Sequence, residues 1–216
     1  MRSAYADAPA TIRTFLWLRS LLTPYDTIAA AFPARGRVLD LGSGHGLLAF
    51  ALARGSEQRQ VVGIDHDPER IRLAEAAALR LDLQSSTKFE AGDLRESLSS
   101  LPPGSFEGIA MIDMLHYFEP ASQESLVHEA ARVLAPGGIL AVREIDRDAR
   151  ITGLVNRFYE RFATGVGFTR SASTALHFRG RRGWMELLQN AGFSVRSERC
   201  GPLFLADVLF VGRRGM

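Results

Sequence analysis

The chain has 216 residues, of which 46% are hydrophobic, and a formal net charge of +2. These values are typical of one globular domain, and no apolar run approaches the roughly 18 residues that a membrane-spanning helix needs. A single cysteine, Cys200, excludes an intrachain disulfide and a zinc site built from several cysteines. Residues 1–10 lack the basic-then-apolar order of a secretory signal, so we expect a cytoplasmic protein.

Charge is unevenly distributed along the chain. Residues 147–216 hold 12 arginines against 5 acidic residues, whereas residues 1–146 hold 14 basic and 19 acidic residues. A basic C-terminal third can attract an anionic substrate, an acidic carrier protein or RNA. The alternative is a solvated surface with internal ion pairs.

Short apolar segments alternate with longer segments of helical periodicity along the chain. Helices are expected over 11–22, 28–32, 47–54, 68–81, 94–99, 121–134, 151–162 and 182–191. Strands are expected over 37–41, 61–64, 87–90, 106–112, 139–144, 193–198 and 203–211. This alternation predicts a doubly wound α/β fold with a mostly parallel seven-stranded sheet and an antiparallel last strand.

The expected elements form a single domain with four parts. A helical cap over 1–35 precedes a ligand-binding core over 36–146. An insertion over 147–180 follows, and a helix and hairpin over 181–216 complete the chain.

A glycine-rich turn, Asp40-Leu-Gly42-Ser-Gly44-His-Gly46, follows the first expected strand. Glycines let the backbone turn sharply and approach a ligand closely, and in open α/β sheets ligands bind at this end of the strands. The dinucleotide fingerprint needs a glycine at the sixth position, where this chain has Leu47. The turn therefore favours a ligand without a pyrophosphate, although a tight turn with no ligand is the alternative.

Two acidic residues end the next two expected strands. Asp65 lies 23 residues after Gly42, the interval that places a carboxylate near a ribose diol. It could instead cap the following helix, but Asp67 is better placed for that role, which leaves Asp65 for a ligand. The sequence Ala91-Gly-Asp93 places a third carboxylate at the same sheet edge, where it is either an adenine contact or a loop aspartate.

Together these segments resemble the class I S-adenosylmethionine-dependent methyltransferases. The matching segments, in chain order, are Val38–Gly46, Asp65, Ala91–Asp93, Ile112–Tyr117 and Leu134–Gly138. The resemblance implies a Rossmann-like fold, S-adenosylmethionine as cofactor and S-adenosylhomocysteine as product.

By position in these motifs, the resemblance also implies a set of cofactor-binding residues. They are Asp40, Gly42, Ser43, Gly44 and Gly46 for the methionine part, Asp65 and His66 for the ribose and the adenine face, Gly92, Asp93 and Leu94 for the adenine, and Asp113 and Met114 for the path to the sulfonium.

Methyl transfer from a sulfonium is a one-step displacement, in which the protein holds the nucleophile in line at about 3 Å. A base is needed when the acceptor is protonated, as a phenol with a pKa of about 10 is at neutral pH. His116 is the first candidate for this base because it follows the fourth expected strand, and the alternative is a histidine with a structural role. Tyr117 and Glu144 are weaker candidates.

The acceptor chamber is expected to combine aromatic and basic side chains from the cap and the insertion. These are Tyr5, Phe15, Trp17, Phe158, Tyr159, Phe162, Phe168, His177 and Phe178, with Arg157, Arg161, Arg170 and Arg179. We interpret Phe15, Phe158 and Phe162 as core residues. The others indicate a small aromatic or conjugated acceptor, either anionic or delivered on an acidic carrier protein, with oxygen favoured over carbon or nitrogen as the methylated atom.

Two other functions stay open. One is an RNA or protein methyltransferase that uses the basic C-terminal third, and the other is a cofactor-binding partner subunit without activity. Nucleic acid is the less favoured substrate because residues 113–116 read Asp-Met-Leu-His and not the Asn/Asp-Pro-Pro-Tyr/Phe of base methyltransferases. No Asp/Asn cluster indicates a metal site, and we expect a monomer or homodimer.

Overall fold

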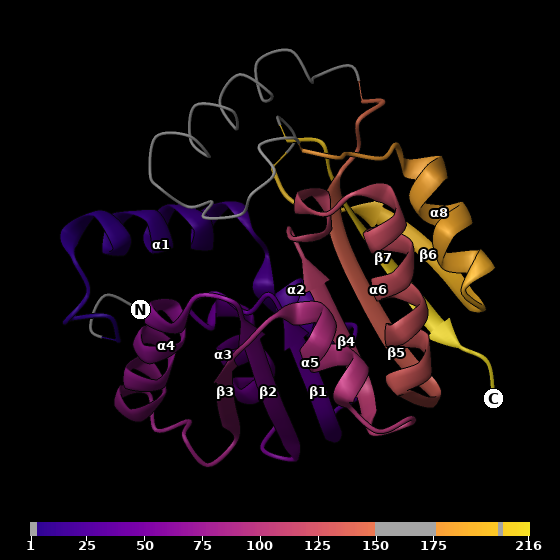
Figure 1. Cartoon of the computed structure of the whole chain (residues 1–216). Helices are drawn as coiled ribbons and strands as arrows, with labels where there is room; N and C mark the ends of the chain where they lie inside the picture. The colour runs from indigo at the N-terminus through magenta and orange to yellow at the C-terminus, as the bar shows by residue number, and fades with distance from the viewer. Residues whose placement is uncertain (1–3, 150–175, 203–204) are drawn as a thin grey trace.

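The computed structural model describes residues 4–149, 176–202 and 205–216. Its strands form one seven-stranded sheet in the order β3-β2-β1-β4-β5-β7-β6 (Figure 1). The strands are β1 (Gly36–Leu41), β2 (Arg59–Asp65), β3 (Thr87–Ala91), β4 (Phe106–Ile112), β5 (Leu134–Ile145), β6 (Phe193–Arg199) and β7 (Asp207–Arg214). The last strand, β7, is antiparallel to both β5 and β6, whereas the pairs among β1 to β5 are parallel. The predicted fold class is confirmed.

Helices cover both faces of the sheet. They are α1 (Ala10–Leu22), α2 (Tyr25–Ala30), α3 (Leu47–Arg54), α4 (Pro68–Arg80), α5 (Leu94–Ser100), the 3-10 helix η1 (Leu115–Tyr117), α6 (Pro120–Val133) and α8 (Arg181–Asn190). One hydrophobic cluster joins the sheet to α2, α3 and α4, and a second joins it to α5, α6 and α8 (in front of the sheet in Figure 1). None of the helices in the described part of the chain is long and apolar enough to cross a membrane.

The central strands are apolar along their length because both faces of the sheet are covered. In β1, Val38 belongs to the first cluster and the next residue, Leu39, to the second, as expected for side chains that alternate between faces. Both side chains are fully buried. This packing fixes the register of β1 and hence the position of the glycine-rich turn that follows it.

β5 begins earlier than the sequence predicted. The Pro136-Gly-Gly138 sequence was expected to end a helix before a strand starting at Ile139, but α6 already ends at Val133. Leu134 pairs with Phe106 and Ile139 with Gly108, so two steps along β4 correspond to five along β5. The proline and glycines therefore form an irregularity inside the strand, which sequence periodicity does not distinguish from a helix end.

The last strand begins later than expected, at Asp207 instead of Leu203, where Asp207 pairs with Ile145 of β5. The helix expected over 151–162 lies outside the described residues. The same holds for seven of the side chains assigned to the acceptor chamber: Arg157, Phe158, Tyr159, Arg161, Phe162, Phe168 and Arg170. The four-part division of the domain stays a prediction.

Candidate functional site

The glycine-rich turn requires glycine at three positions. The backbone φ angles of Gly42, Gly44 and Gly46 are 77°, 54° and 83°, a region that residues with a Cβ rarely adopt. Space is also limited, because a Cβ at Gly46 would lie 2.9 Å from the ring of Phe89. At Gly42 it would lie 3.2 Å from Cβ of Met114, so Met114 packs directly against the turn. The structure thus brings together β1, β3 and the segment after β4, as the predicted site requires.

Asp65 holds the turn in place. Its Oδ2 accepts a hydrogen bond of 2.9 Å from the Gly44 amide, and its Oδ1 accepts one of 3.0 Å from the Asp67 amide. Asp67 caps α4 as expected, accepting from the amides of Glu69 and Arg70. Asp65 does not cap α4, and its carboxylate also binds the turn, so its contact with a ligand stays a prediction. An ionised carboxylate accepts about four hydrogen bonds, so a ribose diol can still bind it.

Two buried oxygens at the turn lack partners. Within the described residues, Asp40 Oδ2 and Ser43 Oγ have no hydrogen-bond partner. Burial, followed by the nearby charge of Asp65, raises the pKa of Asp40 to about 7. A buried polar atom without a partner costs about 1–3 kcal/mol, so this site is suited to a ligand that supplies polar or cationic groups.

Tyr5 contacts the same turn from the N-terminal segment. Its hydroxyl donates a hydrogen bond of 2.6 Å to the carbonyl of His45, and its side chain is buried. Burial raises the pKa of this phenol, which keeps the hydroxyl protonated as a donor. Tyr5 is predicted to lie in the acceptor chamber; the structure shows its contact with the glycine-rich turn, and its place in the chamber stays a prediction. No local sequence signal could have shown a contact that spans 40 residues.

The residues expected near adenine lie at the ends of β2 and β3. Asp93 is the N-cap of α5, where its Oδ1 accepts from the amides of Arg95 and Glu96. The side chain of His66 is half exposed, with Nδ1 3.3 Å from Asp65 Oδ1. Leu94 is buried in the second hydrophobic cluster, so only its backbone is available to a ligand.

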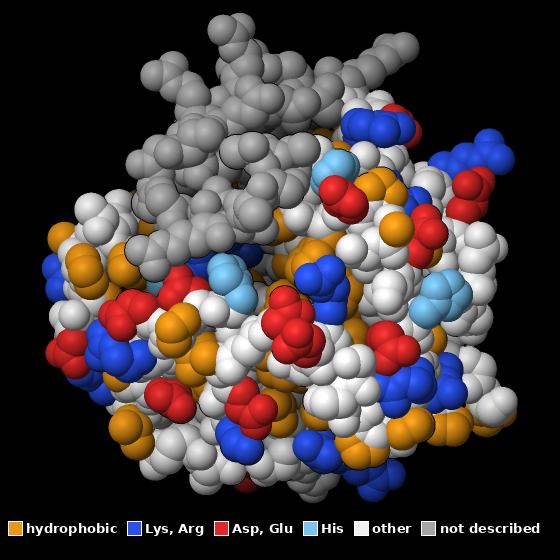
Figure 2. Space-filling view, in the orientation of Figure 1, with side chains coloured by type: hydrophobic (Ala, Val, Ile, Leu, Met, Phe, Trp, Pro, Cys, Tyr) orange, Lys and Arg blue, Asp and Glu red, His pale blue; other side chains and the backbone are white. Residues whose placement is uncertain are grey.

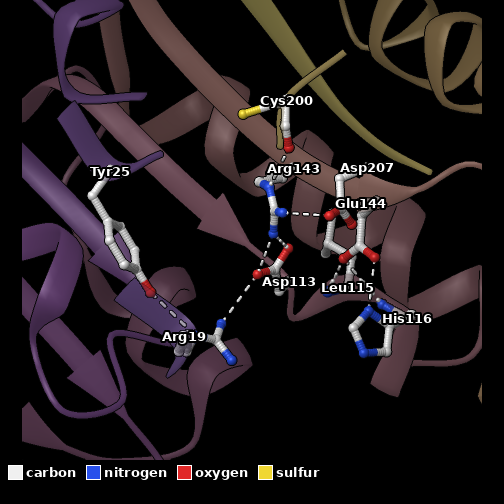
Figure 3. Close-up of polar contacts among 9 residues, drawn as sticks. All are labelled: Arg19, Tyr25, Asp113, Leu115, His116, Arg143, Glu144, Cys200 and Asp207. Atoms are coloured by element: carbon white, nitrogen blue, oxygen red, sulfur yellow. Dashed lines mark hydrogen bonds and ion pairs between the residues drawn. The ribbon is translucent and has the colours of Figure 1, made fainter. Parts of the chain in front are cut away.

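Asp113 lies in an ion-pair network that was not predicted from the sequence of the chain. Its carboxylate pairs with Arg143 at 2.5 Å and with Arg19 of α1 at 3.1 Å (Figure 3). Arg143 also pairs with Asp207 of β7 at 2.5 Å. Asp113 was expected to line the path to the sulfonium, but in the structure its carboxylate joins α1 to the ends of β4 and β5. Its φ of 55° is one that aspartate tolerates better than most residues.

The three candidate catalytic residues lie together at the ends of β4 and β5. Glu144 Oε2 is 2.7 Å from His116 Nδ1, and both side chains are buried (Figure 3). Glu144 Oε1 accepts from the amides of Leu115 and His116, which fixes the carboxylate relative to η1. The ring of Tyr117 lies 4.2 Å from the imidazole, and burial raises the pKa of its hydroxyl. The arrangement is that of a histidine oriented by a carboxylate, which suits proton transfer.

Comparison with known proteins identifies the part of the chain that contains the glycine-rich turn and His116. Residues 38–138 match a family model described as a methyltransferase domain. This part of the chain is a methyltransferase domain. The match includes the glycine-rich turn, Asp65, Asp93 and His116, so the resemblance inferred from the motifs is confirmed.

Relatives of the methyltransferase domain include the ubiquinone biosynthesis O-methyltransferase of Xylella fastidiosa. The two are 39% identical over 124 residues, which cover 56% of this chain and 47% of that protein. A relative from Xanthomonas campestris has the same name and is 34% identical over 124 residues. The chain thus spans about half the length of the curated relatives it matches.

Solved structures show the same fold. An O-methyltransferase family protein from Burkholderia thailandensis superposes with a TM-score of 0.73 at 20% identity, over 99% of this chain and 59% of that one. A SAM-dependent methyltransferase from Methanosarcina mazei gives a TM-score of 0.67 at 22% identity, over 90% of this chain and 100% of that one.

The methyl donor of such a domain fits the residues at the turn. S-adenosylmethionine has a cationic ammonium group, and Asp40 is a buried carboxyl group with a partnerless oxygen. Ser43 Oγ is a second buried polar atom without a partner among the described residues of this turn. Glycine at three turn positions lets a ligand approach the backbone of the turn without an intervening Cβ.

Proposed function

We propose that this chain is an S-adenosylmethionine-dependent O-methyltransferase that acts on a small aromatic or conjugated acceptor. The observation on which the proposal rests is the buried pair of His116, inside the matched methyltransferase domain, and Glu144, which lies at the end of β5 just after the matched residues. Such a pair supplies the base that a hydroxyl acceptor needs and that a donor-binding fold alone does not supply.

Residues at the carboxyl ends of β1, β2 and β3 hold the donor in this proposal. Asp40, Ser43 and the glycine-rich turn bind its methionine part, Asp65 binds the ribose hydroxyls, and Asp93 with its neighbours lies beside the adenine. When bound, the donor supplies an electrophilic methyl group on a sulfonium. The task of the protein is to orient the acceptor oxygen toward that methyl group and to remove its proton.

His116 is the base that receives this proton. Because Glu144 accepts from Nδ1–H, the basic lone pair of the neutral imidazole is on Nε2. The hydroxyl proton would move to Nε2 and give an imidazolium as the acceptor oxygen takes the methyl group; the methyl–sulfur bond would break and the donor would leave as a neutral thioether. The Glu144 carboxylate stabilises this cation, which is the role of the carboxylate in other histidine bases.

Aromatic rings around His116 support an aromatic acceptor. Phe178 is stacked on the imidazole with ring centroids 5.0 Å apart and an interplanar angle of 19°, and Tyr117 packs on it at 4.2 Å. Arg179, which follows Phe178, is paired with Glu124 at 3.0 Å, so the support for an aromatic acceptor comes from the rings and not from this charge. The names of the relatives, which act in ubiquinone biosynthesis, agree with a phenolic hydroxyl as the methylated group.

The surface gives less support to RNA as the substrate. On the face shown in Figure 2, acidic and basic side chains are interspersed over the described residues, with no field of one sign. A footprint for a phosphate backbone would instead be a continuous basic surface.

The proposal is tested by methyl transfer from methyl-labelled S-adenosylmethionine to 3,4-dihydroxybenzoate, and to total tRNA in a parallel reaction. We expect labelled product with the phenolic acid alone, and a mass shift of one methyl group on oxygen. Labelling of tRNA and not of any of a panel of phenols would contradict the proposal. Binding of the donor by calorimetry without transfer to either substrate would favour the partner-subunit function.

A further inference from the structure

Gln123, in the first turn of α6, is a fully buried polar residue that the sequence did not single out. Its Nε2 donates to the carbonyls of Leu115, Phe118 and His177 at 3.1, 3.1 and 2.8 Å. Its Oε1 accepts a hydrogen bond of 2.6 Å from Nε of Arg179. Since a guanidinium only donates, this contact identifies the amide oxygen and directs the NH₂ group toward the three carbonyls.

The carbonyls bound by Gln123 belong to the two backbone segments next to His116. Leu115 is the first residue of η1, directly before His116, and Phe118 follows the last residue of η1. The third, His177, donates its amide to the His116 carbonyl at 2.8 Å, and the following Phe178 is stacked on the imidazole. Gln123 thus joins the segment that contains His116 to the segment that packs on its ring.

The position of Gln123 in α6 is unusual for a helix that packs on a sheet. The other buried residues of this helix, Leu126, Val127, Ala130 and Val133, are all apolar. A buried amide is tolerated only when its polar atoms are bonded, and an apolar residue of the same size would pack without that requirement. A glutamine with all its polar atoms bonded at this position therefore fixes the geometry of its partners, in addition to filling space.

We propose that Gln123 is a positioning residue for His116. Glu144 fixes the imidazole at Nδ1, and Gln123 fixes the η1 backbone and the stacked Phe178, so that Nε2 keeps one direction. The effect on turnover rests on the proposed role of His116 as the base, whereas the effect on the geometry of the ring does not.

The test compares Gln123→Met, which keeps the length of the side chain without its hydrogen bonds, with Gln123→Glu. The glutamate retains an acceptor for Arg179 but has no donor for the three carbonyls. Gln189→Met, at an exposed position of α8, is the matched control. Circular dichroism and the Tm establish that each variant is folded.

The first measurement is the ¹⁵N spectrum of the His116 imidazole, which reports the tautomer and is independent of activity. We expect one tautomer with the proton on Nδ1 in the wild type and in Gln189→Met. In both Gln123 variants Glu144 still accepts from Nδ1, so we expect the tautomer to persist while the His116 signals broaden and the ring-current shift from Phe178 changes. Unchanged His116 signals in either folded variant would overturn the proposal, and Gln123→Glu decides the outcome if Gln123→Met does not fold.

The second measurement is steady-state turnover with 3,4-dihydroxybenzoate. A misplacement of about 1 Å can cost about 100-fold in rate, so we expect kcat to fall about 10- to 100-fold while KM for the donor stays within about twofold. A changed imidazole spectrum with unchanged kcat would retain the positioning role and reject His116 as the base. A rise of about 10- to 100-fold in KM for the donor, with kcat unchanged, would show a general structural role and overturn the proposal.

Discussion

Asp40 shows at the scale of one residue how burial prepares this site for its ligand. Its carboxyl group is buried at the end of β1, has one oxygen without a partner among the described residues, and lies near the charge of Asp65. Burial and that charge together raise its pKa to about 7, so the group is partly protonated at neutral pH. A cationic ligand group would shift it to the ionised form.

We therefore expect binding of S-adenosylmethionine to release protons from Asp40. Because the cation favours the carboxylate, affinity should be full above about pH 7 and decrease as the pH falls through the pKa of the free protein. Calorimetry in buffers of different ionisation enthalpy at pH 7 measures the proton release. Asp40→Asn should abolish the proton release from residue 40, so that only protons released by the ligand itself remain. Equal proton release by the wild type and Asp40→Asn would contradict the assignment.

At the scale of elements, Arg143 of β5 connects three parts of the fold. It pairs with Asp113 after β4 and with Asp207 at the start of β7, and Asp113 in turn pairs with Arg19 of α1 (Figure 3). Burial raises the pKa of Asp207 to about 6 although Arg143 opposes the shift. Desolvation is therefore a large cost here, and the carboxylates depend on the arginine to remain charged in the interior.

Arg143→Met should destabilise the protein because it leaves two buried carboxylates without this partner. The expected loss is about 3–5 kcal/mol of the free energy of unfolding, measured by urea denaturation at pH 7.5. Arg72→Met removes an exposed pair with Glu69 and should change stability little. Adding Asp113→Asn and Asp207→Asn to Arg143→Met should recover part of the loss. An Arg143→Met variant as stable as Arg72→Met would contradict the account.

At the scale of the whole molecule, the sequence predicted the features that depend on local pattern. Alternation of strands and helices predicted the sheet, and the spacing of the glycines predicted the sharp turn after β1, because Gly42, Gly44 and Gly46 have backbone angles that few other residues adopt. Asp67 was correctly assigned as a helix cap from its place before Pro68. Each of these depends on neighbours within a few residues.

Features that depend on contacts distant in the sequence could not be predicted in the same way. Tyr5 reaches the turn across 40 residues, and Gln123 binds His177 across 54. His116 and Glu144 were predicted as separate candidates for the base, and their pairing was not predicted. The fold determines which strands are neighbours, and the packing of the fold determines where their side chains point.

The central claim is that His116, oriented by Glu144, removes the proton of the acceptor in a methyltransferase. The most direct test is the kcat of His116→Ala at saturating S-adenosylmethionine and 3,4-dihydroxybenzoate, beside His128→Ala at an exposed position of α6. A general base contributes about 10²–10⁴-fold, so we predict a loss in that range for His116→Ala, an unchanged Kd for the donor, and wild-type turnover for His128→Ala. Turnover of His116→Ala equal to that of His128→Ala would contradict the account.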